Sequence, residues 1–477
     1  LGKNFVRLNT RLNSEYREGE LISTITPADG GEPEFEIIEQ VRNNKRLELG
    51  LDGERVLNED LLGKAIVLYS LLDQSPELSS QELDPDREQT RFQLEDQETT
   101  QSELITRLEF NWAGIENHAF QFNVERAFNV LDNEQVFTED TGDGPIVIDV
   151  PGGNVRVEEE RWNVVAQDTW ELGRASIDYG IGYERSTITQ TGDAEQERSF
   201  SFIKPRAILT YTPQRGRQTR LRLEREVSQL DFGDFVSAAV FEDDDVALGN
   251  PNLRPDSTWI SELSHERRYG DVTVLKLTGF HHWIEDVLDL LPLSETFEAP
   301  GNIGDGRRWG VIFESTLPVL PDSFDGARLD FKARWQDSTV VDPVTGEDRM
   351  LSGEAGFRTE MAFLNENQWA FDVDFRQDLE DEKVSWGFGF AWRDERVAYK
   401  ADELDIFDEG VEVSAFVQTT RWLGIRLTLE AENATNNTVD RDRTIYEGAR
   451  SLTPVIRRQL REGSSGARLW VRASGTF

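Results

Sequence analysis

The C-terminal segment, residues 467–477, constrains the fold most, because its side chains alternate between apolar and polar. Successive side chains of a β-strand point to opposite faces. One face would therefore carry Ala467, Leu469, Val471, Ala473, Gly475 and Phe477, and the other Arg468, Trp470, Arg472, Ser474 and Thr476. A strand of about eleven residues, tilted by ~45°, rises roughly 25 Å, which is the thickness of the apolar layer that a membrane strand must cross. The segment predicts a strand that can span a membrane.

The same alternation recurs along the chain and is sharpest in its second half. Residues 369–376 and 384–392 place aromatic and aliphatic side chains on one face, and charged residues, polar residues or glycine on the other. Residues 104–112 show the pattern in the first half, and residues 3–13 begin it near the N-terminus. Between residues 15 and 101 the alternation is weaker. The chain is therefore expected to consist of consecutive strands.

Net charge and composition exclude several classes of protein. The chain has 51 Lys and Arg against 91 Asp and Glu, a net charge of −40, whereas binding to nucleic acid needs a cationic surface. We therefore expect no nucleic-acid partner. The absence of Cys excludes disulfides and thiolate metal sites. Mean hydropathy is −0.55, and no run of about 18 apolar residues predicts a transmembrane helix.

A soluble β-sandwich or propeller would also alternate, with its apolar face on a core and its charged face in water. Three features favour a membrane barrel instead. The alternating segments reach about eleven residues, against about five or six in soluble sheets. Trp and Phe gather near their ends, as in an interfacial girdle, and the chain ends on Phe477. We therefore predict an all-β fold, a transmembrane antiparallel β-barrel.

The sequence gives little support to an enzyme. The four histidines are His118, His265, His281 and His282. Neighbouring His281 and His282 would point to opposite faces of a strand, so they cannot ligate one metal from a regular strand. Nucleophile-elbow, phosphate-loop and zinc-protease motifs are absent from the sequence. We expect no catalytic residue and no cofactor, although a hydrolase built from dispersed residues stays open.

The acidic run Glu242, Asp243, Asp244 and Asp245 is the one candidate for a metal site. Hard divalent cations bind several carboxylate oxygens, so this run would bind such a cation. The cation would serve either to hold a ligand or to bridge to lipid phosphates. A solvated loop is the favoured interpretation, so the metal stays unknown. The polar faces of the later strands carry charges of both signs, which would line a permeation path or, as we favour, pair with one another.

Residues 249–256, Gly-Asn-Pro-Asn-Leu-Arg-Pro-Asp, follow a long polar stretch and precede an alternating segment. This passage resembles the point where a long outer loop re-enters the barrel in TonB-dependent outer-membrane receptors. The residues that carry the likeness are Gly249, Asn250, Pro251, Leu253 and Pro255, and the terminal Phe477 adds to it. The Asn-rich residues 432–436 and the glycine-rich residues 299–310 are also similar to passages of such receptors. The resemblance implies a barrel of about 22 strands in the bacterial outer membrane.

The resemblance also implies domains, function and partners. Residues 1–477 would form a single barrel domain with long extracellular loops, and the family's N-terminal plug would be absent, because alternation begins at Asn4. The implied function is a receptor that takes up a ligand, such as a metal chelate or another nutrient, captured by the loops. A plugless pore or scaffold barrel is the alternative. The implied partners are outer-membrane lipid or lipopolysaccharide, a plug domain with the TonB complex, and an unidentified small ligand.

A membrane barrel must also pair its first and last strands, because unpaired backbone groups cost several kcal/mol each in lipid. We therefore expect residues 4–13 to run antiparallel beside residues 467–476. Leu8 and Leu12 would then lie on the outer face together with Leu469 and Val471.

Overall fold

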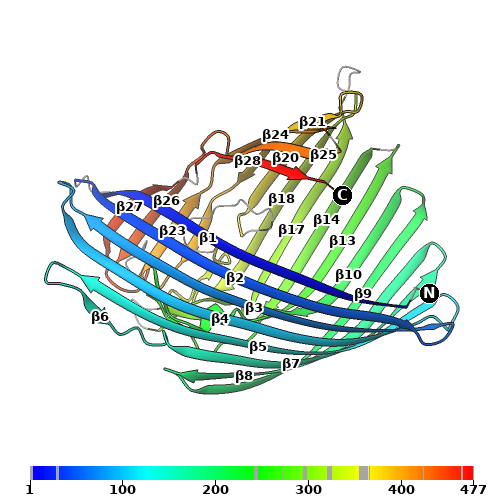
Figure 1. The fold of residues 1–477 in the computed structure, drawn as a ribbon, viewed down its shortest axis with the longest axis horizontal. Coiled ribbons are helices and arrows are strands. Elements are labelled where there is room, and N and C mark those ends of the chain that lie inside the picture. Colours follow the sequence, from blue (N-terminus) through cyan, green and yellow to red (C-terminus); the bar gives the residue numbers. More distant parts are fainter. Residues whose placement is uncertain are drawn as a thin grey trace.

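The computed structural model describes residues 4–27, 32–240, 245–270, 272–293, 298–319, 325–353, 364, 366–422, 424–463 and 466–475. Most of these residues belong to one antiparallel sheet that curves into a barrel (Figure 1). The sheet has 24 strands, and neighbours in sequence pair with one another along most of it. The predicted all-β, antiparallel fold is confirmed. Among the described residues, no helix is long and apolar enough to cross a membrane.

The first five strands are 23 or 24 residues long and lie side by side in chain order. They are β1 (Phe5–Pro27), β2 (Glu34–Val56), β3 (Leu61–Leu83), β4 (Gln89–Trp112) and β5 (His118–Asp140). The sheet continues through β7 (Val155–Leu172), β8 (Ala175–Gly192), β9 (Gln196–Gln214), β10 (Arg217–Val227), β13 (Ser257–Tyr269), β14 (Thr273–Glu285), β17 (Gly306–Pro318), β18 (Ala327–Val341) and β20 (Trp369–Leu379).

The last crossings of the chain are each split into two strands. These are β21 (Val384–Arg393) with β22 (Arg396–Tyr399), β23 (Glu403–Asp408) with β24 (Val411–Trp422), β25 (Ile425–Glu432) with β26 (Val439–Tyr446), and β27 (Val455–Gly463) with β28 (Arg468–Ser474). Two further strands of the sheet, β6 (Ile146–Ile148) and β19 (Asp348–Arg349), are very short. The expected number of about 22 strands is smaller than the 24 strands of the sheet. It is larger than the number of times that the chain crosses the wall from one end to the other, because each split pair of strands makes one crossing.

Apolar side chains cover the outside of the barrel and charged side chains fill its inside. On β4 the outward residues Leu104, Leu108, Phe110 and Trp112 are exposed, Leu108 by 46%. The largest fully buried side chains include several arginines: Arg334, Arg393, Arg396 and Arg441. This distribution is the reverse of a soluble β-sandwich, whose core is apolar. It is the distribution of a sheet whose outer face meets lipid.

The connections differ in length at the two ends of the barrel. One end has tight turns, such as residues 173–174 and 215–216, and the other has long connections, such as residues 228–256, 286–305 and 342–368. In bacterial membrane barrels the short turns are periplasmic and the long loops extracellular. Aromatic residues mark both levels on the outer face: Trp112 and Trp170 lie near the periplasmic turns, and Trp259 and Trp283 near the long loops.

The sheet closes where the end of β1 meets β27. Thr26 pairs with Leu460 and Pro27 with Gln459 in antiparallel register, so the first and last crossings do meet. Among the described residues, no backbone pairs join residues 4–13 to residues 467–475, so the finer expectation that these segments lie side by side stays a prediction. The free edge of β28 is not paired with β1, and in Figure 1 β28 runs away from the first half of β1. The contact between β1 and β27 lies at the end of β1 that faces the long connections.

Candidate functional site in the luminal loops

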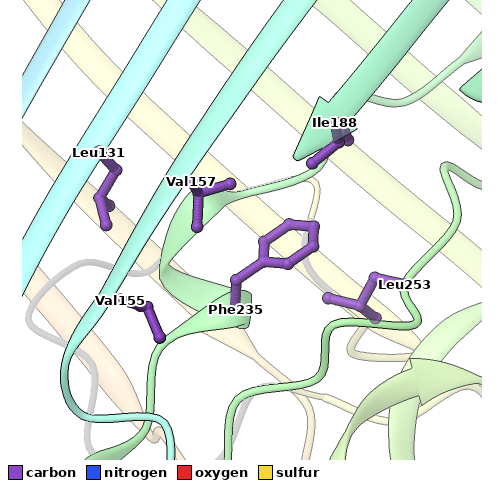
Figure 2. Close-up of a cluster of buried hydrophobic side chains, with 6 residues drawn as sticks. All are labelled: Leu131, Val155, Val157, Ile188, Phe235 and Leu253. Carbon is purple, nitrogen blue, oxygen red and sulfur yellow. The ribbon is translucent and has the colours of Figure 1, made fainter. Parts of the chain in front are cut away.

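The long connection between β10 and β13 folds into the barrel. It contains a short 3₁₀ helix, η1 (Phe232–Phe235), and the two-stranded ribbon of β11 (Ala238–Val240) and β12 (Asp245–Ala247). Figure 2 shows Phe235 among buried side chains from inward positions of three strands and from the loop itself: Leu131, Val155, Val157, Ile188 and Leu253. This long loop therefore packs against the inner wall of β5, β7 and β8.

Local hydrogen bonds shape η1. The Asp231 carboxylate accepts from the backbone N–H of Gly233 at 2.9 Å and caps the first turn. On the wall side, Gln190 Nε2 donates to the carbonyl of Phe235 at 3.3 Å. Burial, and secondarily the charge of Asp231, raises the pKa of Asp234 to about 6. The docked loop thus contains a carboxyl group that titrates well above its usual range.

The sequence motif at residues 249–256 holds η1 in place. Gly249 donates its N–H to Ser237 Oγ at 2.9 Å, and the N–H of Asn250 donates to the carbonyl of Asp234 at 2.9 Å. A Cβ atom at Gly249 would collide with the backbone carbonyl of Phe235, so this close approach needs glycine. Ser237 Oγ in turn donates to the carbonyl of Pro151 at 2.6 Å, which joins the loop between β5 and β7.

Asn250 and Asn302 connect the motif to a second loop. That loop carries the hairpin of β15 (Leu288–Pro292) and β16 (Glu298–Asn302). Asn250 Nδ2 donates to the carbonyl of Pro300 at 2.8 Å, and Asn302 Nδ2 donates to the carbonyl of Arg254 at 2.9 Å. Asn302 Oδ1 also accepts from the N–H of Arg254 at 3.0 Å. The two loops are therefore joined by amide hydrogen bonds in both directions.

The remaining motif residues stabilise this turn. Asn250 Oδ1 accepts from the N–H of Asn252 at 2.8 Å, an Asx-turn that spans Pro251. Leu253 is 1% exposed and packs with Phe235. Pro255 is buried just before β13 begins. Each of these five residues thus has a structural role in the loop junction.

Buried ion pairs join the second loop to two more. Arg349 Nη2 lies 2.9 Å from Asp289 Oδ2, and Arg349 Nε lies 3.4 Å from Asp342 Oδ2. Arg450 Nη2 lies 2.5 Å from the same Asp342 oxygen, and both guanidinium groups lie over the ring of Tyr399. Burial raises the pKa of Asp289. At Asp342 burial also acts to raise the pKa, but the hydrogen bonds from Arg450 and from the N–H of Val344, together with the charges of Arg450 and Arg349, outweigh it and lower the pKa. We call the four connected loops, residues 141–154, 228–256, 286–305 and 342–353, together with Arg450, the luminal loop assembly.

The structure does not test the candidate metal residues. Asp243 and Asp244 lie outside the described residues, and Asp245 is described only as backbone in β12. Phe477 also lies outside them. Within the described part of the chain, no group of three His, Asp or Glu side chains is arranged to hold a metal.

The remaining candidates are the histidines of β14 and the charged residues inside the barrel. The His281 ring lies against that of Trp283, with ring centroids 4.1 Å apart, whereas His282 Nε2 lies 3.9 Å from Glu262 Oε1 on the other face of β14. Inside the barrel, Asp372 lies 2.7 Å from Arg393. This contact agrees with the favoured interpretation that luminal charges pair with one another.

Sequence reasoning missed Ser237, Asp342, Arg349 and Arg450 as parts of the assembly. Their partners lie far away in the chain, and no motif marks them. Asn302 could have been identified from the sequence, because it stands in the glycine-rich segment that resembles receptor passages.

Comparison with known proteins identifies the family. A family model described as "TonB dependent receptor-like, beta-barrel" matches residues 4–436. Among solved structures, the siderophore receptor PiuA from Acinetobacter baumannii is similar at 10% identity and a TM-score of 0.60, covering 98% of this chain and 77% of that one. The ferric-catecholate import receptor Fiu from E. coli K12 is similar at 10% identity, a TM-score of 0.58, and 98% and 77% coverage.

The copper transporter OprC is similar at 9% identity and a TM-score of 0.55, covering 95% of this chain and 80% of that one. No curated protein sequence matches the chain. At these identities the solved structures support the fold, and the family model supports the family. The chain therefore belongs to the TonB-dependent receptor-like β-barrel family, whose members lie in the bacterial outer membrane.

Proposed function

We propose that this barrel is a receptor and transporter for a nutrient, such as a metal chelate, that its extracellular loops capture. The observation that carries the proposal is the luminal loop assembly, in which hydrogen bonds and buried ion pairs hold several loops inside the barrel. Loops in this position can contact a ligand and also obstruct its passage. The similar solved structures are described as copper, siderophore and ferric-catecholate transporters or receptors, which supports a ligand of this class.

The family assignment also bears on partners. We propose that a plug domain and the TonB energy-transducing complex act with this barrel, because the family is TonB-dependent. Outer-membrane lipid and lipopolysaccharide would surround its apolar outer face. The family and the similar structures are receptors and transporters, so we propose neither an enzymatic activity nor a nucleic-acid partner.

The proposal is tested by ligand binding to the purified barrel, with a ferric catecholate chelate and Cu²⁺ as probes. Binding would be followed by tryptophan fluorescence. Asn250→Ala removes the amide that joins two loops, so it should weaken binding of the active probe. Asn58→Ala is the matched control, because Asn58 forms a similar local bond to the N–H of Asp60 in a periplasmic turn.

Conductance in planar bilayers separates the proposal from an open pore. A receptor obstructed by its loops should conduct little current without ligand. A large, steady conductance, with no binding of either probe, would favour the plugless pore or scaffold barrel.

A further inference from the structure

An acidic side chain lies on the lipid-facing side of the wall, close to the periplasmic turns. Asp168 on β7 stands two residues from Ala166 and from Trp170, which are both exposed on the outer face. Side chains two residues apart on a strand share a face, so Asp168 belongs to the outer face as well. The residue is nevertheless covered, at 2% exposed. Ionisable residues are costly in a membrane-spanning segment, so Asp168 is a candidate for a functional site.

Two donors on neighbouring strands cover the carboxylate. His118 Nδ1 lies 2.6 Å from Asp168 Oδ2, and the Tyr179 hydroxyl donates to the same oxygen at 2.8 Å. The His118 ring lies against the rings of Trp170 and Phe120, with centroids 5.4 and 5.6 Å away. An ionised carboxylate only accepts, so His118 Nδ1 is the donor, which a neutral imidazole supplies. The carboxylate therefore keeps its negative charge in this contact.

The second oxygen of this carboxylate remains without a donor. Asp168 Oδ1 is buried and has no hydrogen-bond partner among the described residues. Arg206 borders the same part of the wall, but its Nε lies 3.5 Å from Asp178, an inward residue of β8. A buried acceptor without a donor costs free energy, and more so when it is charged. Asp168 is therefore expected to bind a donor, preferably a cation, from outside the described chain.

A groove of about 700 Å³ on the outer face contains this carboxylate. The register places four of its lining residues in one row of cross-strand pairs on β4, β5, β7 and β8: Trp112, Phe120, Asp168 and Tyr179. Aromatic rings thus flank the carboxylate on both sides, and aromatic faces attract cations. Trp and Tyr side chains also mark the level of the lipid head groups.

The groove continues from Asp168 toward the middle of the membrane. Ala166 is the next outward residue of β7 in that direction, away from the tight turn of residues 173–174. Its cross-strand partners are Phe122 and Ile181, and all three residues line the groove. A methyl group between two larger apolar side chains leaves a hollow that suits an acyl chain. The groove therefore has a polar end at the head-group level and an apolar end deeper in the membrane.

We propose that this groove binds phosphatidylethanolamine of the periplasmic leaflet, with its ammonium group on Asp168 and an acyl chain over Ala166. A primary ammonium carries N–H donors and a positive charge, so it can satisfy Oδ1 and also lie against the flanking aromatic rings. A choline head group is a cation without N–H donors, and a glycerol head group carries no cation. This site lies on the outside of the barrel and is independent of ligand capture by the luminal loop assembly.

Photo-crosslinking with a series of lipids tests the head group. The barrel would be reconstituted in phosphatidylglycerol vesicles that contain a trace of photoactivatable phosphatidylethanolamine, of its N-methyl or N,N-dimethyl form, or of phosphatidylcholine, all with the same acyl chains. Labelling of residues 118–124, 162–170 and 177–183 should be strongest with phosphatidylethanolamine. It should fall as methyl groups replace N–H donors, by about tenfold over the series.

Equal labelling by all four lipids would overturn the proposal. The series uses the unaltered chain, so this result decides the question whether or not a variant assembles.

Two substitutions separate the head-group contact from the acyl-chain contact. Asp168→Asn removes the charge and keeps the shape, so labelling by phosphatidylethanolamine should fall about tenfold, to the level of phosphatidylcholine. Ala166→Leu fills the hollow, so it should lower labelling by both lipids while the preference between them persists. A preference that survives Asp168→Asn, or labelling that Ala166→Leu leaves unchanged, would contradict the proposal.

Glu160→Gln and Ala333→Leu are the matched controls. Glu160 is an outward carboxylate of the same strand, and its Oε1 lies 2.9 Å from Arg126 Nε. Ala333 is an outward alanine of β18, and its cross-strand partners are Phe313 and Phe371. Neither control should change the labelling, and heat-modifiable mobility would establish that each variant is folded. A control that lost as much labelling as its test variant would overturn the proposal.

Discussion

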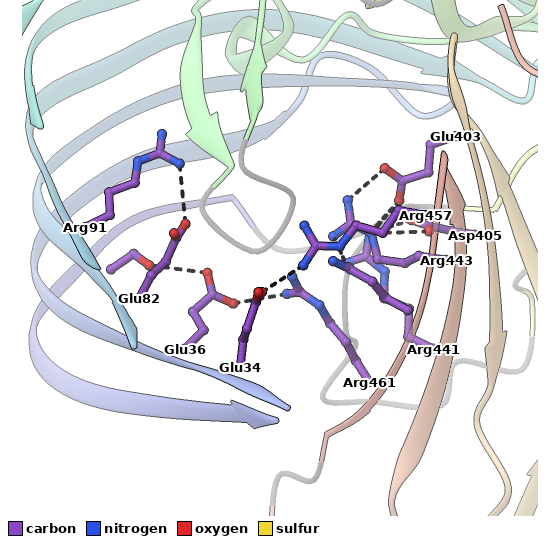
Figure 3. Close-up of polar contacts among 12 residues, drawn as sticks. Glu34, Glu36, Glu82, Arg91, Glu403, Asp405, Arg441, Arg443, Arg457 and Arg461 are labelled. Carbon is purple, nitrogen blue, oxygen red and sulfur yellow. Dashed lines mark hydrogen bonds and ion pairs between the residues drawn. The ribbon is translucent and has the colours of Figure 1, made fainter. Parts of the chain in front are cut away.

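Arg461→Ala should destabilise the folded barrel much more than Arg457→Ala, although each removes one ion pair between β2 and β27, Arg461 with Glu36 or Arg457 with Glu34 (Figure 3). Arg461 and Glu36 are 5% and 3% exposed, so the substitution leaves a carboxylate buried without its guanidinium partner. Breaking a buried pair by removing one member costs about 3 to 5 kcal/mol. Arg457 and Glu34 are 43% and 51% exposed, and a pair of that kind contributes about 0 to 1 kcal/mol.

The assay is urea unfolding of barrels reconstituted in vesicles, followed by tryptophan fluorescence and heat-modifiable mobility. A double-mutant cycle with Glu36→Gln isolates the pair, because Glu36 also accepts from Ser80 Oγ at 3.3 Å. The coupling energy should be large for Arg461 with Glu36 and near zero for Arg457 with Glu34. Equal destabilisation by the two arginine substitutions would refute the reasoning that burial determines which ion pair between β2 and β27 stabilises the barrel.

Three further predictions concern the loops and the lipid face. Gly249→Ala should release η1, because its Cβ collides with the carbonyl of Phe235, and hydrogen exchange of residues 228–256 should rise; unchanged exchange would contradict the close approach. The pKa of Asp234 is higher in the docked loop than its ordinary 3.8, so docking should be strongest below pH 3.8 and weaken as pH rises through about 6; Asp234→Asn should remove this pH dependence of exchange. Phe388→Arg, on the lipid face of β21, should cost about 2 to 4 kcal/mol near the midplane, and a cost no greater than that of an inward substitution would argue against a lipid-facing wall.

The alternation of side chains predicted the fold well because the two environments of a barrel wall differ so strongly. Leu104, Leu108 and Phe110 could be assigned to the outer face from their spacing alone, and the structure exposes them. The motif at Gly249 likewise predicted where a loop re-enters the barrel. Both features involve residues that are close together in the sequence, so they can be recognised before the fold is known.

The contacts between loops could not be predicted in the same way. Asn250 meets Pro300, and Arg450 meets Asp342, across long stretches of chain that carry no periodic pattern. The register of closure could not be derived from the sequence for a related reason. Alternation determines which face a side chain takes, but a strand can slide by two residues without changing that face. Only the contact of Thr26 with Leu460 defines the register.

The unequal strand lengths give the barrel a slanted rim. β1 to β5 have 23 or 24 residues and rise roughly 50 Å at a 45° tilt, about twice the thickness of the apolar layer. β10 has 11 residues and β14 has 13, so that side of the wall barely clears the membrane. Molecules that diffuse along the cell surface therefore meet a high wall at β1 to β5 and a low wall at β10 and β14. The plane of the entrance is tilted toward the short strands β10 and β14, whose following loops fold inward.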